Sequence, residues 1–303
     1  MNTAAPVRGL WCAMLTPLDA SGAVDHELLV AHARSLLVKG VDGVAPFGTT
    51  GEGQSFSMAE RIAGVEALLA GGIAPERVVA ATGCAALPET IALTRHGART
   101  GCAACLVLPP FFWKDATDDG LFAWYAKVIE AVGDPRLRIY LYHIPQVSGT
   151  PLSVDLIARL AGAFPGVIAG VKDSAGDWSN TESLLARVPQ LAILVGHEPH
   201  LPRLMRAHGA GTICGVGNLY PALVRALMAP GVTPADEQRM ATFLEIAFRV
   251  PFLAGFKAIL AEQTRNPAWR SVRPPLLPLA HAARESLLAA LREAGLAAGG
   301  ADQ

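Results

Sequence analysis

The chain has 303 residues and a mass of 31.7 kDa, with 51% hydrophobic and only 17% charged side chains. Twenty-five basic residues balance twenty-six acidic ones, which leaves a formal net charge of −1. A nucleic-acid binder would need a basic face, so that class of function is disfavoured. The abundance of apolar side chains argues against disorder and predicts a large buried core.

The sequence predicts neither a membrane span nor a secretory signal. Its longest stretch without charged side chains, residues 207–224, contains four glycines and Pro221, which makes a poor spanning helix. The first ten residues lack a basic region followed by an apolar block. Five cysteines, an odd number, suit reduced thiols, and the C-x-x-C of Cys102 and Cys105 has no second pair to complete a zinc site. We therefore expect a cytoplasmic protein.

Short apolar runs alternate along the chain with longer segments of helical spacing. The apolar runs predict strands at residues 9–16, 43–46, 77–82, 103–108, 138–142, 167–172, 192–195 and 211–214. The segments between them predict helices at 25–39, 58–70, 87–100, 117–132, 153–164, 178–187 and 198–208, with a further helix that starts near Pro221. Ser57 with Glu60 forms a capping box, and Ser153 can cap the fifth helix.

Eight strands, each followed by a helix, predict an α/β fold of the (β/α)8 TIM-barrel type. The rival is a doubly wound open sheet, but no G-x-G-x-x-G follows the first strand. We expect residues 1–227 to form the catalytic barrel. Residues 228–303 are expected to form a C-terminal helical extension with helices at 234–249, 251–263 and 279–294.

Catalytic groups of such barrels lie at the carboxyl ends of the strands, and Lys172 is the strongest candidate there. It ends the apolar run 167–171. A buried amine is disfavoured in its charged form and can act as a neutral nucleophile. The alternative is a structural lysine paired with Asp173. Lys257, in an apolar helix, is expected to be snorkelling or structural. The remaining three lysines lie at helix ends or on polar faces: Lys39, Lys114 and Lys127.

Two further motifs follow predicted strands. The run G-T-T-G-E-G at 48–53 combines glycines for a tight turn with paired hydroxyls that can hold a carboxylate. Tyr142 ends the fifth strand, where its phenol can either carry protons or serve as a bonded core side chain. The histidines His143, His197, His200 and His208 lack the H-E-x-x-H spacing, so we expect no metal.

These motifs resemble the dihydrodipicolinate synthase / N-acetylneuraminate lyase family. The resemblance rests on G-T-T-G-E at 48–52, Tyr142-x-Ile144-Pro145 and G-V-K-D-S-A-G-D at 170–177, and it covers nearly the whole chain. It implies a class I aldolase-type barrel, usually a homotetramer, that forms a Schiff base between lysine and a 2-oxo acid such as pyruvate. No metal or organic cofactor is implied.

Carried over by motif, the resemblance implies a set of site residues. Lys172 corresponds to the Schiff-base lysine and Tyr142 to the proton-handling tyrosine, tuned by Thr50. The hydroxyls that bind the carboxylate and relay protons correspond to Thr49 and Thr50, beside Gly48. Further substrate contacts are implied for Ile213, through its carbonyl, and for Gly196, Ser174 and Glu198, with His197 and Gln146 as additional candidates.

The chain also departs from members that make dihydrodipicolinate. Those members carry a tyrosine pair after the fourth strand, where this chain has Phe111 and Phe112 beside Trp113, an apolar patch that can serve subunit contact. They also carry an arginine two residues after Pro145, where this chain has Val147. His143 stands where an asparagine is frequent, and the sequence offers no account of it.

We therefore hypothesise a Schiff-base lyase that cleaves, condenses or dehydrates a 2-keto-3-deoxy sugar acid or a related 2-oxo acid. One alternative is 4-hydroxy-tetrahydrodipicolinate synthase, which condenses pyruvate with aspartate semialdehyde. An alternative of another class is a non-catalytic protein that binds 2-oxo acids.

Overall fold

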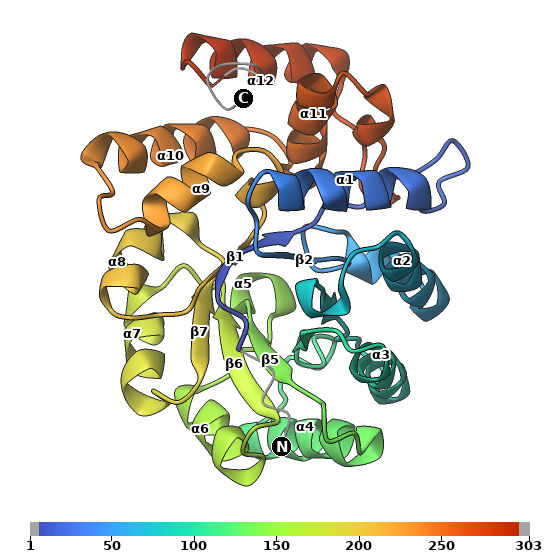
Figure 1. Cartoon of the computed structure of the whole chain (residues 1–303), viewed down its shortest axis with the longest axis vertical. Helices are drawn as coiled ribbons and strands as arrows, with labels where there is room; N and C mark the ends of the chain where they lie inside the picture. Colours follow the sequence, from blue (N-terminus) through green and yellow to red (C-terminus); the bar gives the residue numbers. More distant parts are fainter. Residues whose placement is uncertain (1–5, 297–303) are drawn as a thin grey trace.

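The structure is a computed structural model that describes residues 6–296, and it contains one eight-stranded parallel sheet. The strands follow the order β2-β1-β8-β7-β6-β5-β4-β3, and a parallel bridge between Val44 and Val78 joins its two ends. The sheet is therefore a nearly closed barrel (Figure 1). Its strands are β1 (Gly9–Ala13), β2 (Gly43–Ala45), β3 (Val79–Ala81), β4 (Ala104–Val107), β5 (Ile139–His143), β6 (Ile168–Asp173), β7 (Ala192–Val195) and β8 (Gly211–Cys214).

A helix follows each strand on the outside of the barrel (Figure 1). These helices are α1 (His26–Val38), α2 (Met58–Ala70), α3 (Leu87–Arg99), α4 (Asp118–Val132), α6 (Val154–Ala163), α7 (Trp178–Arg187), α8 (Leu201–Arg206) and α9 (Pro221–Met228). The predicted (β/α)8 barrel is thus confirmed. In the described part of the chain no helix is long and apolar enough to cross a membrane.

Side-chain caps explain why several helices begin where the sequence predicts. Ser57 accepts a hydrogen bond from the Glu60 N–H while Glu60 bonds back to Ser57, which is the expected capping box of α2. Ser153 accepts from the Leu156 N–H and caps α6, also as expected. Both caps satisfy N–H groups that the first helical turn leaves without partners.

The sequence prediction differs from the structure after β5 and after β7. A short helix, α5 (Pro145–Ser148), follows β5 where no helix was expected. The single helix expected at 198–208 is instead a 3₁₀ turn (Glu198–His200) followed by α8. Pro199 and Pro202 lie in this segment, and proline removes a backbone donor that a continuous helix requires.

The alternation of side chains along each strand produces two layers of packing. Outward side chains pack against the helices, whereas inward ones fill the barrel with residues such as Trp11, Leu106, Tyr140 and Leu194. Gly170 on β6 makes room for one of them, because a Cβ there would lie 2.3 Å from the Tyr140 ring. The same alternation turns Tyr142 on β5 inward, to the carboxyl-end mouth of the barrel.

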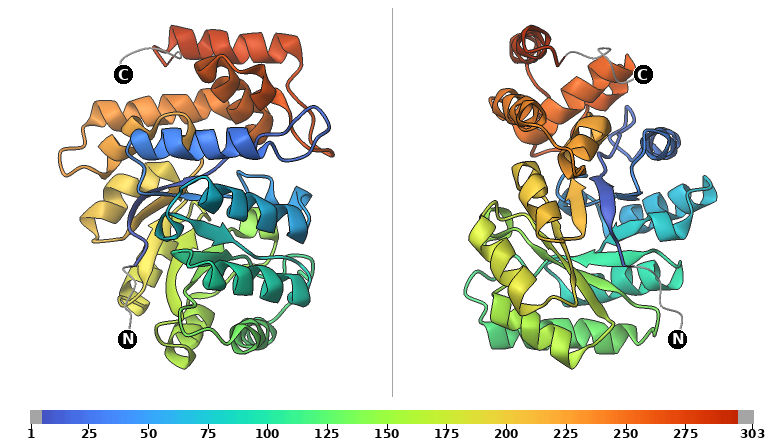
Figure 2. Two further views of the ribbon diagram at one scale, coloured as in Figure 1. Left: turned by 45° about the vertical axis from the view of Figure 1, so that its right-hand side comes forward. Right: turned by 60° about the vertical axis from the view of Figure 1, so that its left-hand side comes forward.

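Three helices follow the barrel: α10 (Pro234–Ala247), α11 (Phe252–Thr264) and α12 (His281–Glu293). They gather at one end of the molecule beside α1 and α9 (Figures 1 and 2). Because α10 and α11 also line a cavity at the barrel mouth, the extension packs onto the functional face of the barrel. The division of the chain at residues 227 and 228 stays a prediction.

Candidate active site

A cavity of about 430 Å³ opens at the carboxyl ends of strands β5 to β8, and we call it the lysine cavity. Strand ends and the loops after them supply one part of its wall, and the C-terminal extension supplies the other. It is lined by Thr49, Thr50, Tyr142, Ile144, Gln146, Val147, Lys172, Ser174, Gly196, His197, Glu198, Ile213, Cys214, Gly215, Val216, Leu244, Phe248, Phe252 and Phe256. All but one of the predicted site residues therefore meet in one place.

Lys172 lies buried on β6, directly beside Tyr142 on β5 in the strand register. Its amine nitrogen lies 4.1 Å from the centroid of the Tyr142 ring. Asp173 does not pair with it, because that carboxylate accepts hydrogen bonds from the Ala175 N–H and from the side chains of Asn180 and Thr181. Within residues 6–296, Lys172 has no ion pair. The structural reading of a lysine paired with Asp173 is therefore wrong.

The loop after β2 brings two hydroxyl groups to the same cavity. The hydroxyl of Thr49 lies 3.2 Å from the phenol oxygen of Tyr142, and Thr50 is buried beside Gly215. Glycines permit this tight loop, because a Cβ on Gly53 would lie 1.7 Å from the Phe47 carbonyl oxygen. We expected Thr50 to tune the phenol, but the hydrogen bond in the described structure comes from Thr49.

Gly48 is the one predicted site residue that does not line the lysine cavity. It lines a second cavity of about 320 Å³, which shares Thr49, Tyr142 and Val147 with the lysine cavity. Arg61 also lines this second cavity, where its guanidinium donates to the Ala81 carbonyl. The phenol–threonine contact thus lies between two cavities of the barrel mouth.

Polar side chains surround the far part of the lysine cavity. The Ser174 hydroxyl is buried without a hydrogen-bond partner among the described residues. Burial raises the pKa of the Glu198 carboxyl, whose oxygen lies 3.4 Å from the Val216 nitrogen. Burial lowers the pKa of His197. Gln146 donates to the Ser174 carbonyl at 2.6 Å. A carboxyl group and a hydroxyl without a partner can both form hydrogen bonds with hydroxyl groups of a ligand.

Gly196 leaves the space that these groups need. It follows β7 and faces Ser174 and Lys172, so a Cβ there would lie 2.0 Å from the Ser174 hydroxyl oxygen. Ile213 lies on β8, the strand beside β7, and also lines the cavity. The roles predicted for both residues stay predictions.

The structure gives an account of His143, which the sequence did not. Its side chain is buried, and its Nδ1 accepts a hydrogen bond from the Leu152 N–H at 3.1 Å. Burial lowers the pKa of this imidazole, while the nearby Asp173 carboxylate acts in the opposite direction. His143 therefore holds the end of the loop that follows β5, and this loop carries Gln146 to the cavity wall.

Sequence reasoning missed the contribution of the C-terminal extension. Phe248, Phe252 and Phe256 line the lysine cavity and are spaced four residues apart, as neighbours on one helical face would be. That spacing could have indicated from the sequence that these phenylalanines share one surface. It is, however, equally typical of a helix whose apolar face packs against the core. Of the two roles expected for Lys257, the structure favours the structural one, because its side chain is fully buried and forms an ion pair with Glu52 instead of reaching solvent.

A buried amine beside a phenol can add to a carbonyl carbon while the phenol moves a proton. The paired hydroxyls can hold a carboxylate next to that carbonyl. Among the described residues, no three His, Cys, Asp or Glu side chains are grouped to hold a metal. The arrangement is complete for Schiff-base chemistry with the groups that the chain itself supplies.

Comparison with known proteins agrees with this geometry. The model of the dihydrodipicolinate synthetase family matches residues 6–294. An uncharacterized DapA-like lyase of Chloroflexus aurantiacus is 36% identical over 290 residues, which cover 93% of this chain and 95% of the relative.

Two solved structures share the fold over nearly their whole length. The dihydrodipicolinate synthase of Agrobacterium tumefaciens has a TM-score of 0.89 and 38% identity, over 94% of this chain and 98% of that one. YagE, a prophage protein of E. coli K12 whose structure is in complex with pyruvate, has a TM-score of 0.87 and 25% identity, over 96% and 100%. The chain therefore belongs to the dihydrodipicolinate synthetase family, whose members are class I aldolase-type lyases that act through a Schiff base between lysine and pyruvate.

Proposed function

We propose that Lys172 forms the Schiff base of this enzyme with the C2 carbonyl of pyruvate or another 2-oxo acid. The observation that carries the proposal is the placement of its buried amine, unpaired with any carboxylate, beside the Tyr142 ring. Thr49, Thr50 and the backbone N–H groups of their loop hold the carboxylate of the substrate. No metal or organic cofactor takes part in this proposal.

The proposed cleavage or condensation depends on an iminium, whose positive charge draws electrons from a neighbouring bond. The neutral amine of Lys172 adds to C2, and Tyr142 donates its phenol proton to the C2 hydroxyl, which leaves as water. The product is a positively charged iminium beside a phenolate, and the iminium can accept electrons from the C3–C4 bond. In the cleavage direction Tyr142 accepts the proton of the C4 hydroxyl as that bond breaks, so an aldehyde leaves and an enamine remains. The enamine takes a proton at C3, and water then releases pyruvate and the free lysine.

The distal wall of the lysine cavity suits a substrate whose distal part is uncharged and hydroxylated. Among its described lining residues Lys172 is the only lysine or arginine, and it is committed to C2. A second carboxylate on the substrate would therefore meet no cation there. Ser174, Glu198 and His197 instead offer hydrogen bonds for hydroxyl groups, beside the apolar Phe248 and Phe252. We propose a 2-keto-3-deoxy sugar acid or a related 2-oxo acid as the substrate class.

A second candidate is 4-hydroxy-tetrahydrodipicolinate synthase, which the name of the Agrobacterium relative favours. Two residues argue against it. Val147 stands at the position where synthases carry an arginine for the carboxylate of aspartate semialdehyde, and an apolar side chain cannot bind that carboxylate. Phe112 stands where they carry a relay tyrosine, and a phenyl ring cannot pass a proton.

Borohydride trapping tests the role of Lys172. Reduction in the presence of pyruvate should add a stable mass to the peptide that contains Lys172, and Lys172→Ala should abolish it. Lys127→Ala, which removes a lysine of α4 outside the cavity, serves as the matched control and should be labelled like wild type. A label on Lys257, or no label on the wild-type chain, would contradict the mechanism.

A pyruvate-release screen separates the two substrate classes. The wild-type enzyme should release pyruvate from at least one 2-keto-3-deoxy sugar acid or hydroxylated 2-oxo acid. A coupled assay with pyruvate and aspartate semialdehyde should show no comparable condensation. Efficient condensation with the semialdehyde and no release from the sugar acids would instead favour the synthase.

We further propose a cytoplasmic homotetramer. Phe112 and Trp113 are 68% and 65% exposed and stack edge to face, an apolar pair that suits a contact between subunits. Five free cysteines, four of them buried, are consistent with a reducing compartment. Sedimentation of the wild-type protein as a monomer would contradict the assembly.

A further inference from the structure

Glu52 connects the hydroxyl loop to the C-terminal extension. We use the name hydroxyl loop for residues 48–53, which carry Thr49 and Thr50 between β2 and α2. The backbone of Glu52 is left-handed, with φ 55°, and its side chain is fully buried. A left-handed backbone is unfavourable for a residue other than glycine, and burial is unfavourable for a charged side chain. Both costs have to be offset by the contacts of the residue. The partners of Glu52 therefore explain why it lies there.

All of those partners come from the C-terminal part of the chain. One carboxylate oxygen forms an ion pair with the buried ammonium group of Lys257 on α11. The other oxygen accepts a hydrogen bond of 3.0 Å from the backbone N–H of Arg273. Lys257 in turn donates to the Ser271 carbonyl at 2.7 Å. Burial lowers the pKa of Lys257, and the charge of Glu52 opposes that shift.

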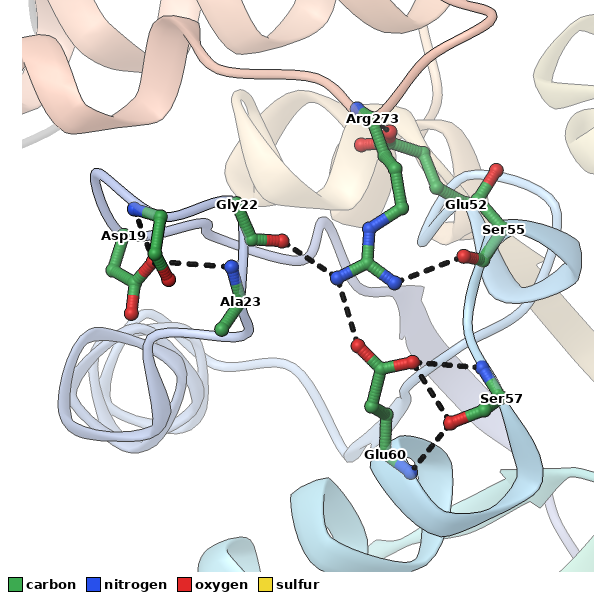
Figure 3. A network of polar contacts seen from close by, with 9 residues as sticks. Asp19, Gly22, Ala23, Glu52, Ser55, Ser57, Glu60 and Arg273 are labelled. Atoms are coloured by element: carbon green, nitrogen blue, oxygen red, sulfur yellow. Dashed lines mark hydrogen bonds and ion pairs between the residues drawn. The ribbon is translucent and has the colours of Figure 1, made fainter.

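Arg273 fastens the same extension to the exit of the hydroxyl loop (Figure 3). Its guanidinium donates to the carbonyl oxygens of Ser55 at 3.0 Å and Gly22 at 2.6 Å. It also forms an ion pair of 2.8 Å with Glu60, the residue that closes the capping box of α2. Its bond to Glu60 is the main reason that the pKa of this carboxyl falls to about 2.

The bonds inside the hydroxyl loop fix its shape but not its distance from α11. The Glu52 N–H donates to the Thr49 carbonyl, and Thr16 donates to the Gly51 carbonyl, so these bonds tie the loop to itself and to β1. Only Glu52 reaches α11 from this loop among the contacts described above. Phe256, the neighbour of Lys257 in α11, lines the lysine cavity together with Thr49 and Thr50 of the loop. The buried pair therefore joins two elements that line the same cavity.

We propose that Glu52, Lys257 and Arg273 are positioning residues, which hold the hydroxyl loop so that Thr49 and Thr50 can bind the substrate carboxylate. The inference rests on the proposed function, because it assumes that this loop binds the carboxylate next to the Schiff-base carbon. It assigns to the C-terminal extension a role in pyruvate binding, although the extension supplies no hydroxyl or amine to the reaction.

The first test replaces the half-buried Arg273. Arg273→Ala keeps its backbone bond to Glu52 but removes the guanidinium contacts. We expect the pyruvate concentration for half-maximal borohydride trapping to rise at least fivefold, while the trapping rate at saturation stays within twofold of wild type. Arg159→Ala is the matched control. Like Arg273, which lies over the Phe56 ring and pairs with Glu60, Arg159 lies over a phenyl ring and pairs with a carboxylate, but it belongs to α6 and lines neither cavity.

The second test removes the buried charges together. Glu52→Gln with Lys257→Met leaves no unpaired buried charge, so it should fold where either single change leaves one. We expect at least a fivefold rise in half-saturating pyruvate for this double variant as well. Lower melting temperatures with an unchanged half-saturating concentration in both variants would overturn the proposal and leave a purely structural role. Wild-type protein that is not trapped at Lys172 would instead refute the proposed function itself.

Discussion

Replacement of Gly196 by alanine tests whether the end of β7 determines the position of the proposed Schiff-base lysine. Gly196 does not have a positive φ, so the substitution changes the space at this position and not the backbone preference. The added Cβ would lie 2.0 Å from the Ser174 hydroxyl oxygen, 3.0 Å from the Ser174 Cβ and 3.2 Å from the Lys172 Cε. Both side chains must therefore move.

The size of the expected effect follows from these distances. The Ser174 hydroxyl has no hydrogen-bond partner among the described residues, so its rotation breaks no bond. The Lys172 chain has to shift by a few tenths of an ångström. A misplacement of about 1 Å costs about 10²-fold in rate, so we expect Gly196→Ala to slow Schiff-base formation about 10-fold. Overpacking should also lower the free energy of unfolding by about 1–3 kcal/mol.

The assay is the rate of borohydride trapping at saturating pyruvate. Gly162→Ala is the matched control, because a Cβ at that position of α6 meets no atom within 4 Å. Adding Ser174→Ala to Gly196→Ala removes the closest atom and should recover part of the rate. A Gly196→Ala enzyme that is trapped as fast as wild type would refute the reasoning. The position of the Lys172 amine would then not depend on the space that Gly196 leaves beside it.

Two further predictions concern Tyr142 and His32. Tyr142→Phe should lower turnover by about 10²–10⁴, the range for a positioned acid–base group, and an unchanged turnover would remove the phenol from its role. Burial lowers the pKa of His32 from 6.5 to about 4, although the hydrogen bond that its Nε2 donates to Asn218 Oδ1 acts in the opposite direction. The histidine of the unfolded chain is therefore protonated first as the pH falls. Stability from this neutral histidine is full above pH 6.5 and is lost toward pH 4. Between pH 7 and pH 4.5, the free energy of unfolding in urea should fall by about 2–3 kcal/mol less in His32→Gln than in wild type. Equal losses in the two proteins would contradict the pKa shift.

The barrel could be predicted from the sequence because its determinants are local. Apolar runs such as 192–195 end at Gly or Thr, and α2 begins at a capping box that is visible in the sequence. Lys172 could be singled out for a similar reason, since it is the lysine that ends an apolar strand rather than a helix. Local spacing and the barrel rule together place the reacting end of the site.

The remainder of the site depends on contacts that local patterns do not encode. Glu52 and Lys257 form an ion pair although they are 205 positions apart in the chain. In the sequence, Glu52 looks like an ordinary acidic residue of a loop and Lys257 like an ordinary lysine of a helix. The phenol bonds to Thr49 rather than Thr50, in a loop that has Phe47 and Glu52 on either side, both at positive φ. The order of residues within the motif does not indicate which of two adjacent hydroxyls reaches a side chain on another strand.

The two walls of the lysine cavity come from different parts of the chain and have different roles in the proposed reaction. Lys172, Tyr142 and Thr49 come from strand ends and their loops, where the barrel holds them within a few ångströms of one another. Phe248 and Phe252 come from the end of α10 and from α11, and they line the same cavity. Because these two side chains belong to elements outside the barrel, substitutions in the helical wall can change the shape of the cavity without moving the amine on β6.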